Sequence, residues 1–119
     1  MTEFIDTHAI KAIVSLQRPG KPDLLLRIVE LFKSETPKAI VAMQTGLDES
    51  DLSSVRNAAH TLKSSSAYVG AKALSERCRD LEAAAREENF PACFALCDGI
   101  EDLFDDSCAE LQNVISKAA

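Results

Sequence analysis

DLSSVRNAAHTLKSSSAYVGAKAL, residues 51–74, is the stretch that decides the fold. Its aliphatic and small residues recur every three or four positions, the spacing that places side chains on one face of an α-helix. We therefore predict a helix over about residues 51–67 and a tight connection at Tyr68-Val69-Gly70. The residues of the predicted inward face are Leu52, Val55, Ala59, Leu62 and Ser66.

The same periodicity predicts two helices before this stretch. A short helix covers residues 7–17, with Asp6 or Thr7 as its N-cap. A longer helix has Pro22 in its first turn, where a missing N–H costs nothing, and continues as one kinked helix through Pro37.

Two further helices are predicted after it. One covers residues 71–88, and the last runs without interruption from near Pro91 to Ser116, with Gly99 inside it. The inward stripe of this last helix is predicted to contain Phe94, Cys97, Ile100, Phe104, Leu111 and Ile115, joined by Cys93 and Cys108.

Composition supports an all-α fold. The 119 residues suffice for one domain, residues 1–119, and 46% of them are hydrophobic, with four Gly and four Pro. The sequence shows no period-two alternation that would indicate a sheet. Short connections between successive amphipathic helices favour antiparallel neighbours, so we predict an antiparallel up-and-down four-helix bundle with an additional short N-terminal helix.

The net charge and the termini restrict the partners and the compartment. A net charge of −6 argues against nucleic acid and against an anionic membrane surface as the main partner. The N-terminus resembles no signal peptide, and no apolar run reaches the roughly 20 residues that span a bilayer. We therefore expect a cytoplasmic protein with four reduced cysteines, and neither a metal site nor a cofactor.

His60 is the residue in this stretch most suited to chemistry. Each residue advances a helix by about 100°, so His60 lies roughly 130° from the centre of the inward face and should point to water. Two cations, Arg56 and Lys63, flank it. Asn57, Ser64 and Ala67 complete its surroundings with short side chains that leave room for another protein. Periodicity alone is equally compatible with an ordinary surface histidine.

A resemblance to a known family separates these two interpretations. The segment from Ala59 to Ala67, AHTLKSSSA, followed by Val69-Gly70-Ala71 and then Leu74, resembles the signature of histidine phosphotransfer domains. The departure is Ser64, which stands where that family usually has Gly. A serine there can hydrogen-bond the phosphorylated ring from one turn away and affect transfer rate or partner choice.

The resemblance implies a role for each residue of the motif. His60 accepts and donates the phosphoryl group, Lys63 stabilises it, and Gly70 permits the tight turn after the helix. Ser64 joins them at the reacting site, and Arg56, Asn57 and Ala67 are expected to contact the partner.

The resemblance also implies the partners: response-regulator receiver domains and a hybrid sensor kinase, with Mg²⁺ held by the receiver. We expect a monomeric shuttle without its own kinase activity, since no Gly-rich nucleotide loop is present.

Two other classes stay open at this point. A phosphoacceptor hairpin of a sensor kinase usually has an acidic residue directly after its histidine, where this chain has Thr61. A non-catalytic helical adaptor would keep partner binding after loss of the His60 side chain.

Overall fold

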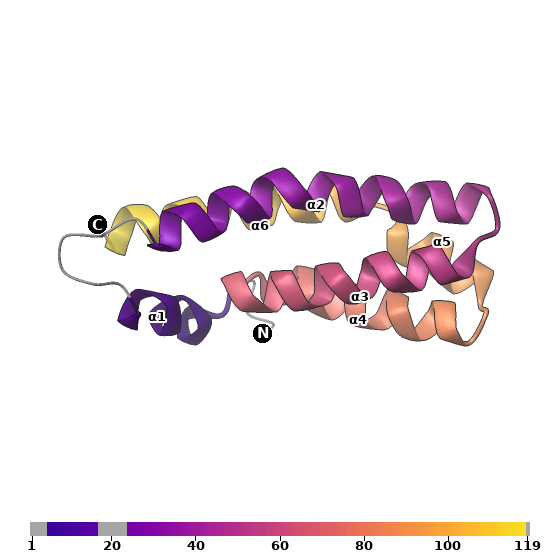
Figure 1. Ribbon diagram of the computed structural model, residues 1–119, viewed down its shortest axis with the longest axis horizontal. Coiled ribbons are helices and arrows are strands. Elements are labelled where there is room, and N and C mark those ends of the chain that lie inside the picture. Colours follow the sequence, from indigo (N-terminus) through magenta and orange to yellow (C-terminus); the bar gives the residue numbers. More distant parts are fainter. Residues whose placement is uncertain (1–4, 17–23, 119) are drawn as a thin grey trace.

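The computed structural model describes residues 5–16 and 24–118, and these residues form six helices and no strand (Figure 1). The helices are α1 (Thr7–Ser15), α2 (Leu24–Asp48), α3 (Leu52–Val69), α4 (Lys72–Arg86), α5 (Phe90–Cys97) and α6 (Ile100–Ala118). The predicted Pro22 lies outside the described residues. None of the described helices is long and apolar enough to cross a membrane.

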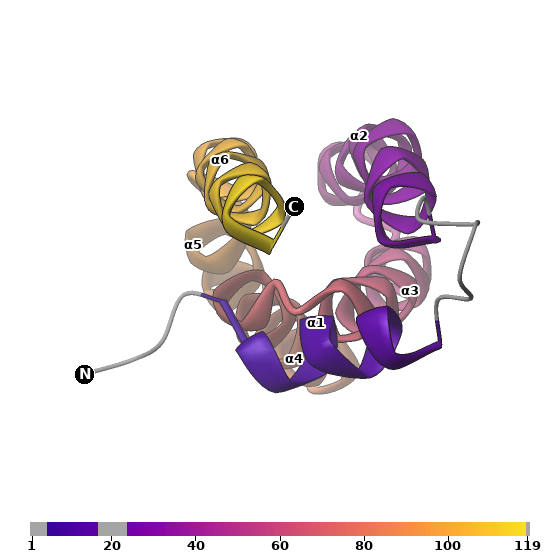
Figure 2. The same cartoon turned by 90° about the vertical axis from the view of Figure 1, so that its left-hand side faces the viewer.

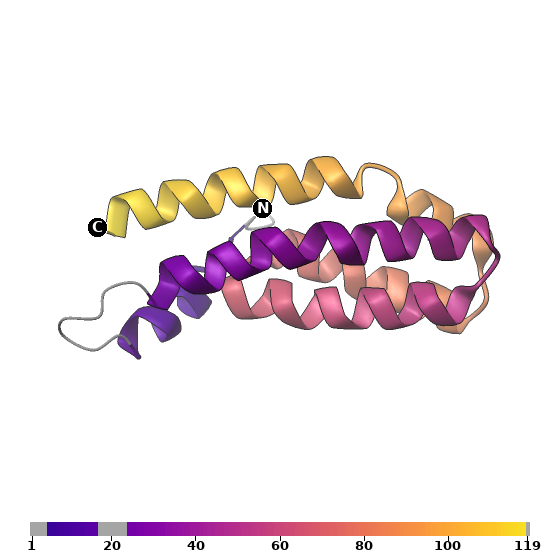
Figure 3. The same ribbon diagram turned by 45° about the horizontal axis from the view of Figure 1, so that its top comes forward.

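The long helices run up and down along one common axis, which confirms the predicted helical bundle. Figure 1 shows α2 and α6 side by side above α3 and α4, with the chain reversing direction between α2, α3 and α4. The short helix α1 lies across one end of the bundle, under the connection between α3 and α4 (Figure 2). Figure 3 shows that α2 and α6 extend beyond that end of the α3–α4 pair.

Local sequence signals place the ends of the first three helices. The Asp6 carboxylate accepts hydrogen bonds from the backbone N–H groups of His8 and Ala9, so Asp6 is the N-cap of α1. Asp51 caps α3 in the same way through the N–H of Ser54. Helix α2 continues through Pro37 as one helix, as predicted.

The structure corrects the predicted end of α3, at the connection between α3 and α4. Helix α3 continues to Val69, two residues beyond the prediction, and Gly70 adopts the left-handed conformation with φ +85°. The N–H of Ala71 donates to the carbonyl of Ser66 at 2.8 Å, which closes the helix end. Tyr68 is therefore a helical, exposed residue rather than part of a loop, whereas Val69 is buried.

The prediction of one uninterrupted last helix is wrong, because the helix is interrupted at Asp98 and Gly99 and forms two helices, α5 and α6. Asp98 is extended and Gly99 has φ +76°, a conformation that glycine adopts at no steric cost. The Arg77 guanidinium donates to the carbonyls of Leu96 and Asp98, at 3.2 and 3.3 Å, and thereby satisfies backbone groups that the break leaves without helical partners.

The break also changes which side chains face the core. Phe94 was predicted to point inward, but it is 51% exposed, since α5 no longer shares the axis of α6. The buried residues of the rest of this stripe are Cys93, Cys97, Ile100, Phe104 and Leu111.

The four cysteines are free thiols, as predicted. Cys78, Cys93 and Cys97 are buried and Cys108 is partly buried. Burial raises the pKa of the Cys78 thiol to about 12, so it stays protonated and acts as a small apolar side chain.

Two glycines with positive φ provide a test of the turn between α3 and α4. A Cβ at Gly70 would lie 2.7 Å from the Asp6 carbonyl oxygen, whereas a Cβ at Gly99 would meet nothing within 4 Å. We expect Gly70→Ala to lower the free energy of unfolding by about 2–4 kcal/mol, because strain and overlap add. Gly99→Ala, which has the conformational cost alone, should lose about 1 kcal/mol.

Urea unfolding followed by circular dichroism measures both losses. Equal destabilisation by the two substitutions would show that contact with Asp6 does not constrain the turn.

Candidate functional site

His60 lies on the outer face of α3, as the periodicity predicted. Its neighbours Ala59 and Leu62 are buried, at 0% and 1% exposure, and they direct that side of the helix into the core. The His60 side chain is 63% exposed. The imidazole is therefore open to a protein that approaches from solvent.

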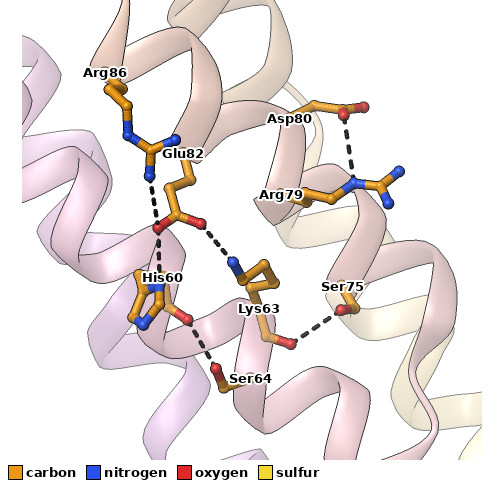
Figure 4. Close-up of polar contacts among 8 residues, drawn as sticks. All are labelled: His60, Lys63, Ser64, Ser75, Arg79, Asp80, Glu82 and Arg86. Carbon is orange, nitrogen blue, oxygen red and sulfur yellow. Dashed lines mark hydrogen bonds and ion pairs between the residues drawn. The ribbon is translucent and has the colours of Figure 1, made fainter.

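A carboxylate from the neighbouring helix holds the imidazole in place (Figure 4). The Oε2 atom of Glu82, on α4, lies 2.7 Å from Nδ1 of His60. Its other oxygen, Oε1, accepts a hydrogen bond of 2.7 Å from Nζ of Lys63. The Arg86 guanidinium lies 3.5 Å from Oε2, one turn further along α4. One carboxylate thus has three partners, and two of them, His60 and Lys63, connect α4 to α3.

The contact with Glu82 determines which ring nitrogen carries the proton. An ionised carboxylate only accepts hydrogen bonds, so Nδ1 must be the N–H donor at 2.7 Å. In the neutral ring, Nε2 then keeps its lone pair. The exposed edge of the imidazole presents a nucleophilic nitrogen, oriented by a group that is itself held by two cations.

Glu82 is ionised in this environment although its side chain is only 9% exposed. The hydrogen bond from Lys63 is the largest influence on it and lowers the pKa of the carboxyl group, and the hydrogen bond from His60 acts in the same direction. Burial raises the pKa, but the contacts outweigh it and the net result is a pKa below the ordinary value for Glu.

Lys63 and Ser64 lie next to His60, but each is engaged within the protein. Lys63 is 31% exposed in its side chain and contacts Glu82, and its backbone carbonyl accepts a hydrogen bond of 3.0 Å from Ser75. The Ser64 hydroxyl donates to the backbone carbonyl of His60 at 3.3 Å, along its own helix, and not to the imidazole ring.

The residues predicted to contact a partner are all exposed on α3 around the imidazole. They are Arg56, Asn57 and Ala67. The second cation of the carboxylate cluster is Arg86 rather than Arg56. Gly70 lies at the end of α3 and forms the predicted turn.

Sequence reasoning missed Glu82 and Arg86 as site residues. A signal for Glu82 was present, because it directly follows Leu81 and lies one turn after Cys78, both fully buried on the inner stripe of α4. A carboxylate so close to an apolar stripe is buried and needs a cationic or hydrogen-bonding partner. Periodicity did not reveal that this partner set would include His60.

The described part of the chain contains no cluster of side chains that could bind a metal ion. Within residues 5–16 and 24–118, no group of three His, Cys, Asp or Glu side chains is arranged to hold a metal ion. His8, the other histidine, is an exposed residue at the start of α1.

Sequence comparisons with known proteins indicate one family. The sequence profile of the Hpt domain matches residues 27–115. Histidine-containing phosphotransfer protein 2 of Arabidopsis thaliana is 31% identical over 93 residues, and protein 5 of the same plant is 30% identical over 93 residues. Each match covers 76% of this chain but only 59% of the relative, so the chain spans little more than half the length of these proteins.

Solved structures agree in fold. Histidine-containing phosphotransfer protein B from Pseudomonas aeruginosa superposes with a TM-score of 0.84 over 98% of both chains, at 18% sequence identity. A putative histidine-containing phosphotransfer protein from rice has a TM-score of 0.80 over 95% of this chain and 82% of its own, at 22% identity. At these identities the likeness supports the fold alone.

The buried carboxylate makes stability depend on pH. We expect Glu82→Gln to lower the free energy of unfolding near pH 7 by about 1–3 kcal/mol, since charge-assisted hydrogen bonds are lost. Because folding lowers the pKa of Glu82, its ionised form stabilises the fold above the ordinary Glu pKa, and this contribution disappears as pH falls through the lowered value. The gap between wild type and variant should therefore shrink between about pH 6 and about pH 3.

Urea unfolding at several pH values measures this gap. Glu110→Gln, which removes an exposed carboxylate of α6, is the matched control and should show little change. A gap that stays constant down to about pH 3 would contradict the role given to the ionised carboxylate.

Proposed function

Because the chain belongs to the Hpt domain family, we propose that it is a phosphorelay intermediate that carries a phosphoryl group on His60. One observation supports this above the others. His60 is exposed, and its Nδ1 is bound to a buried carboxylate, which leaves the lone pair on Nε2 of the neutral ring available. A histidine placed only for solubility has no need of such an orienting partner.

The transfer step follows from this geometry. The lone pair of Nε2 attacks the phosphorus of an aspartyl phosphate on a receiver domain and forms the N–P bond. The bond between phosphorus and the aspartyl oxygen breaks, and its electron pair leaves with the regenerated carboxylate. The ring then carries a positive charge with the proton still on Nδ1, where the Glu82 carboxylate stabilises it. The reverse sequence passes the group to a second receiver.

Electrostatics near the ring favour this step. A loose phosphoryl-transfer transition state depends on positioning and on compensation of negative charge. Lys63 lies one turn from His60 on the same helix, and its partly exposed ammonium group can move from Glu82 towards a phosphoryl group. Mg²⁺ belongs to the receiver in this proposal, and no cofactor is assigned to this chain.

The proposal includes a cellular setting. The chain acts as a cytoplasmic, monomeric shuttle between a hybrid sensor kinase and response-regulator receivers, without kinase activity of its own and without nucleic acid or membrane as a partner. Its acidic composition supports the last part, since a net charge of −6 opposes binding to phosphate-rich surfaces.

Phosphate labelling tests the proposal directly. Incubation with a phosphorylated receiver domain should give a label on this chain that is acid-labile and base-stable, because an N–P bond hydrolyses in acid. His60→Gln should lose the label completely and keep the helical circular dichroism spectrum, since residue 60 is exposed. A label that persists in this variant would assign the phosphoryl group to another residue, whereas intact receiver binding without any label on wild type would favour the adaptor class.

The role of Lys63 is tested separately. We expect Lys63→Ala to slow transfer by about tenfold, which corresponds to the loss of about one charge-assisted contact in the transition state. The transfer rate is measured from reactions that are stopped at successive times. Circular dichroism shows whether the variant keeps its helical content. Arg79→Ala, which removes an exposed cation from α4 outside the Glu82 cluster, is the control. Equal rates for wild type and Lys63→Ala would remove this residue from the mechanism.

A further inference from the structure

A pocket of about 430 Å³ lies where α2 ends and where α5 is followed by α6. Figure 1 and Figure 3 both show α5 close to the end of α2. We call it the acidic pocket, because its described lining includes Asp48, Asp98, Glu101 and Asp102 and no Lys, Arg or His. The side chains of the His60 cluster come from α3 and α4, so the acidic pocket is a separate feature.

Helix geometry explains only two of these carboxylates. Glu101 and Asp102 lie in the first turn of α6, where the partial positive charge of a helix N-terminus stabilises acidic side chains. Asp48 is the last residue of α2, and Asp98 is the C-cap of α5. A carboxylate at a helix C-terminus meets the partial negative charge of the last carbonyl groups, so these two positions are unfavourable for the helices themselves. Neither helix has a basic residue in its last turn to offset them.

The carboxylates of the acidic pocket also lack cationic partners within the described residues. No salt bridge there involves any of the four, and Glu101 has a neutral partner, Gln44, whose Nε2 donates to Oε1 at 2.6 Å. Arg77 lies nearby, but its guanidinium donates to two backbone carbonyls at the end of α5. The stretch 98–106 contains five acidic residues and no basic one. The pocket is therefore a concentration of negative charge that no described cation of the protein neutralises.

An aromatic ring forms another part of the pocket. Phe94 is 51% exposed and lies in the lining. The face of such a ring carries partial negative charge and attracts a guanidinium or ammonium group within about 6 Å. Leu47 and Ile100, also in the lining, offer apolar surface to the aliphatic stem of a basic side chain. A metal ion fits less well, because within residues 5–16 and 24–118 no three His, Cys, Asp or Glu side chains are arranged to bind one.

We propose that the acidic pocket binds a basic segment of a partner polypeptide, with an arginine guanidinium over the Phe94 ring and salt bridges to Asp48 and Asp98. Charge identifies this occupant. Nucleic acid and an anionic membrane surface would bring like charge to the pocket, and a second copy of this chain carries a net charge of −6. A segment bound here contacts none of the residues of the His60 cluster, so its binding does not depend on phosphotransfer.

A defined peptide tests the proposal on the full chain. The probe is a capped peptide of three arginines separated by alanines, titrated into isotope-labelled protein and followed by NMR chemical shifts at low salt. The amide signals of Phe94, Asp98 and Gly99 should move, with a Kd below about 1 mM. The same peptide with glutamine in place of each arginine should leave the spectrum unchanged, because it keeps the length and loses the charge.

Matched variants separate the pocket from the overall charge of the protein. Asp48→Asn combined with Asp98→Asn should raise the Kd about tenfold, since two salt bridges are lost. Glu30→Gln combined with Glu110→Gln removes the same charge from exposed positions outside the pocket and should stay within about twofold of wild type. Phe94→Leu keeps an apolar side chain, loses the ring face and should raise the Kd about threefold.

Other results would overturn the inference in recognisable ways. Equal Kd values for the two double variants would reduce the interaction to net charge. The same shifts produced by MgCl₂ alone would assign the pocket to a metal ion, and no shift at Phe94 with several millimolar peptide would leave it without a basic occupant. If circular dichroism shows that the Asp48→Asn and Asp98→Asn variant has lost its helices, Phe94→Leu decides.

The inference is also separable from the proposed function. His60→Gln should bind the peptide with the affinity of wild type, because residue 60 lies outside the lining of the acidic pocket. Failure of the phosphate-labelling experiment would therefore leave this binding result intact. Weaker peptide binding by His60→Gln would show that the peptide contacts the α3–α4 cluster instead.

Discussion

The carboxylate of Glu82 is the group on which the candidate site depends. It is nearly buried, and its two oxygens accept contacts from His60, Lys63 and Arg86. Each of these contacts has a separate consequence: the first orients the ring, the second keeps the carboxylate ionised, and the third adds a second cation on α4. An exposed histidine without such a partner would rotate freely and exchange its proton between both nitrogens.

Close packing of α3 against α4 makes this contact short. Both helices bury small residues, Ala59 on α3 and Cys78 and Ala85 on α4. Small side chains let two helices approach closely, so that a glutamate on one reaches the ring of a histidine on the other. The left-handed conformation of Gly70 closes α3, and the absence of a side chain there leaves room for the Asp6 carbonyl.

The rest of the bundle separates stability from reactivity. The core contains apolar residues of all six helices, and Phe32 and Phe104 make an edge-to-face contact in it at 5.6 Å between ring centroids. The break at Gly99 lies between α5 and α6, and Arg77 of α4 contacts the backbone there, whereas the side chains of the His60 cluster come from α3 and α4.

The sequence by itself determined the helical class, the inner faces of the long helices and the outward direction of His60. Periodicity suffices for these, because each depends only on rotation about a residue's own helix axis. The same reasoning failed at Gly99, where the apolar pattern of a helix continues across a break between two helices, and so it placed Phe94 in the core.

Tertiary structure alone decided that Glu82 and Arg86, not Arg56, complete the cluster, and that Phe94 and Asp48 line one pocket. Such meetings depend on the rotation and alignment of one helix against another. Packing of the whole core sets those quantities, and no single helix encodes them.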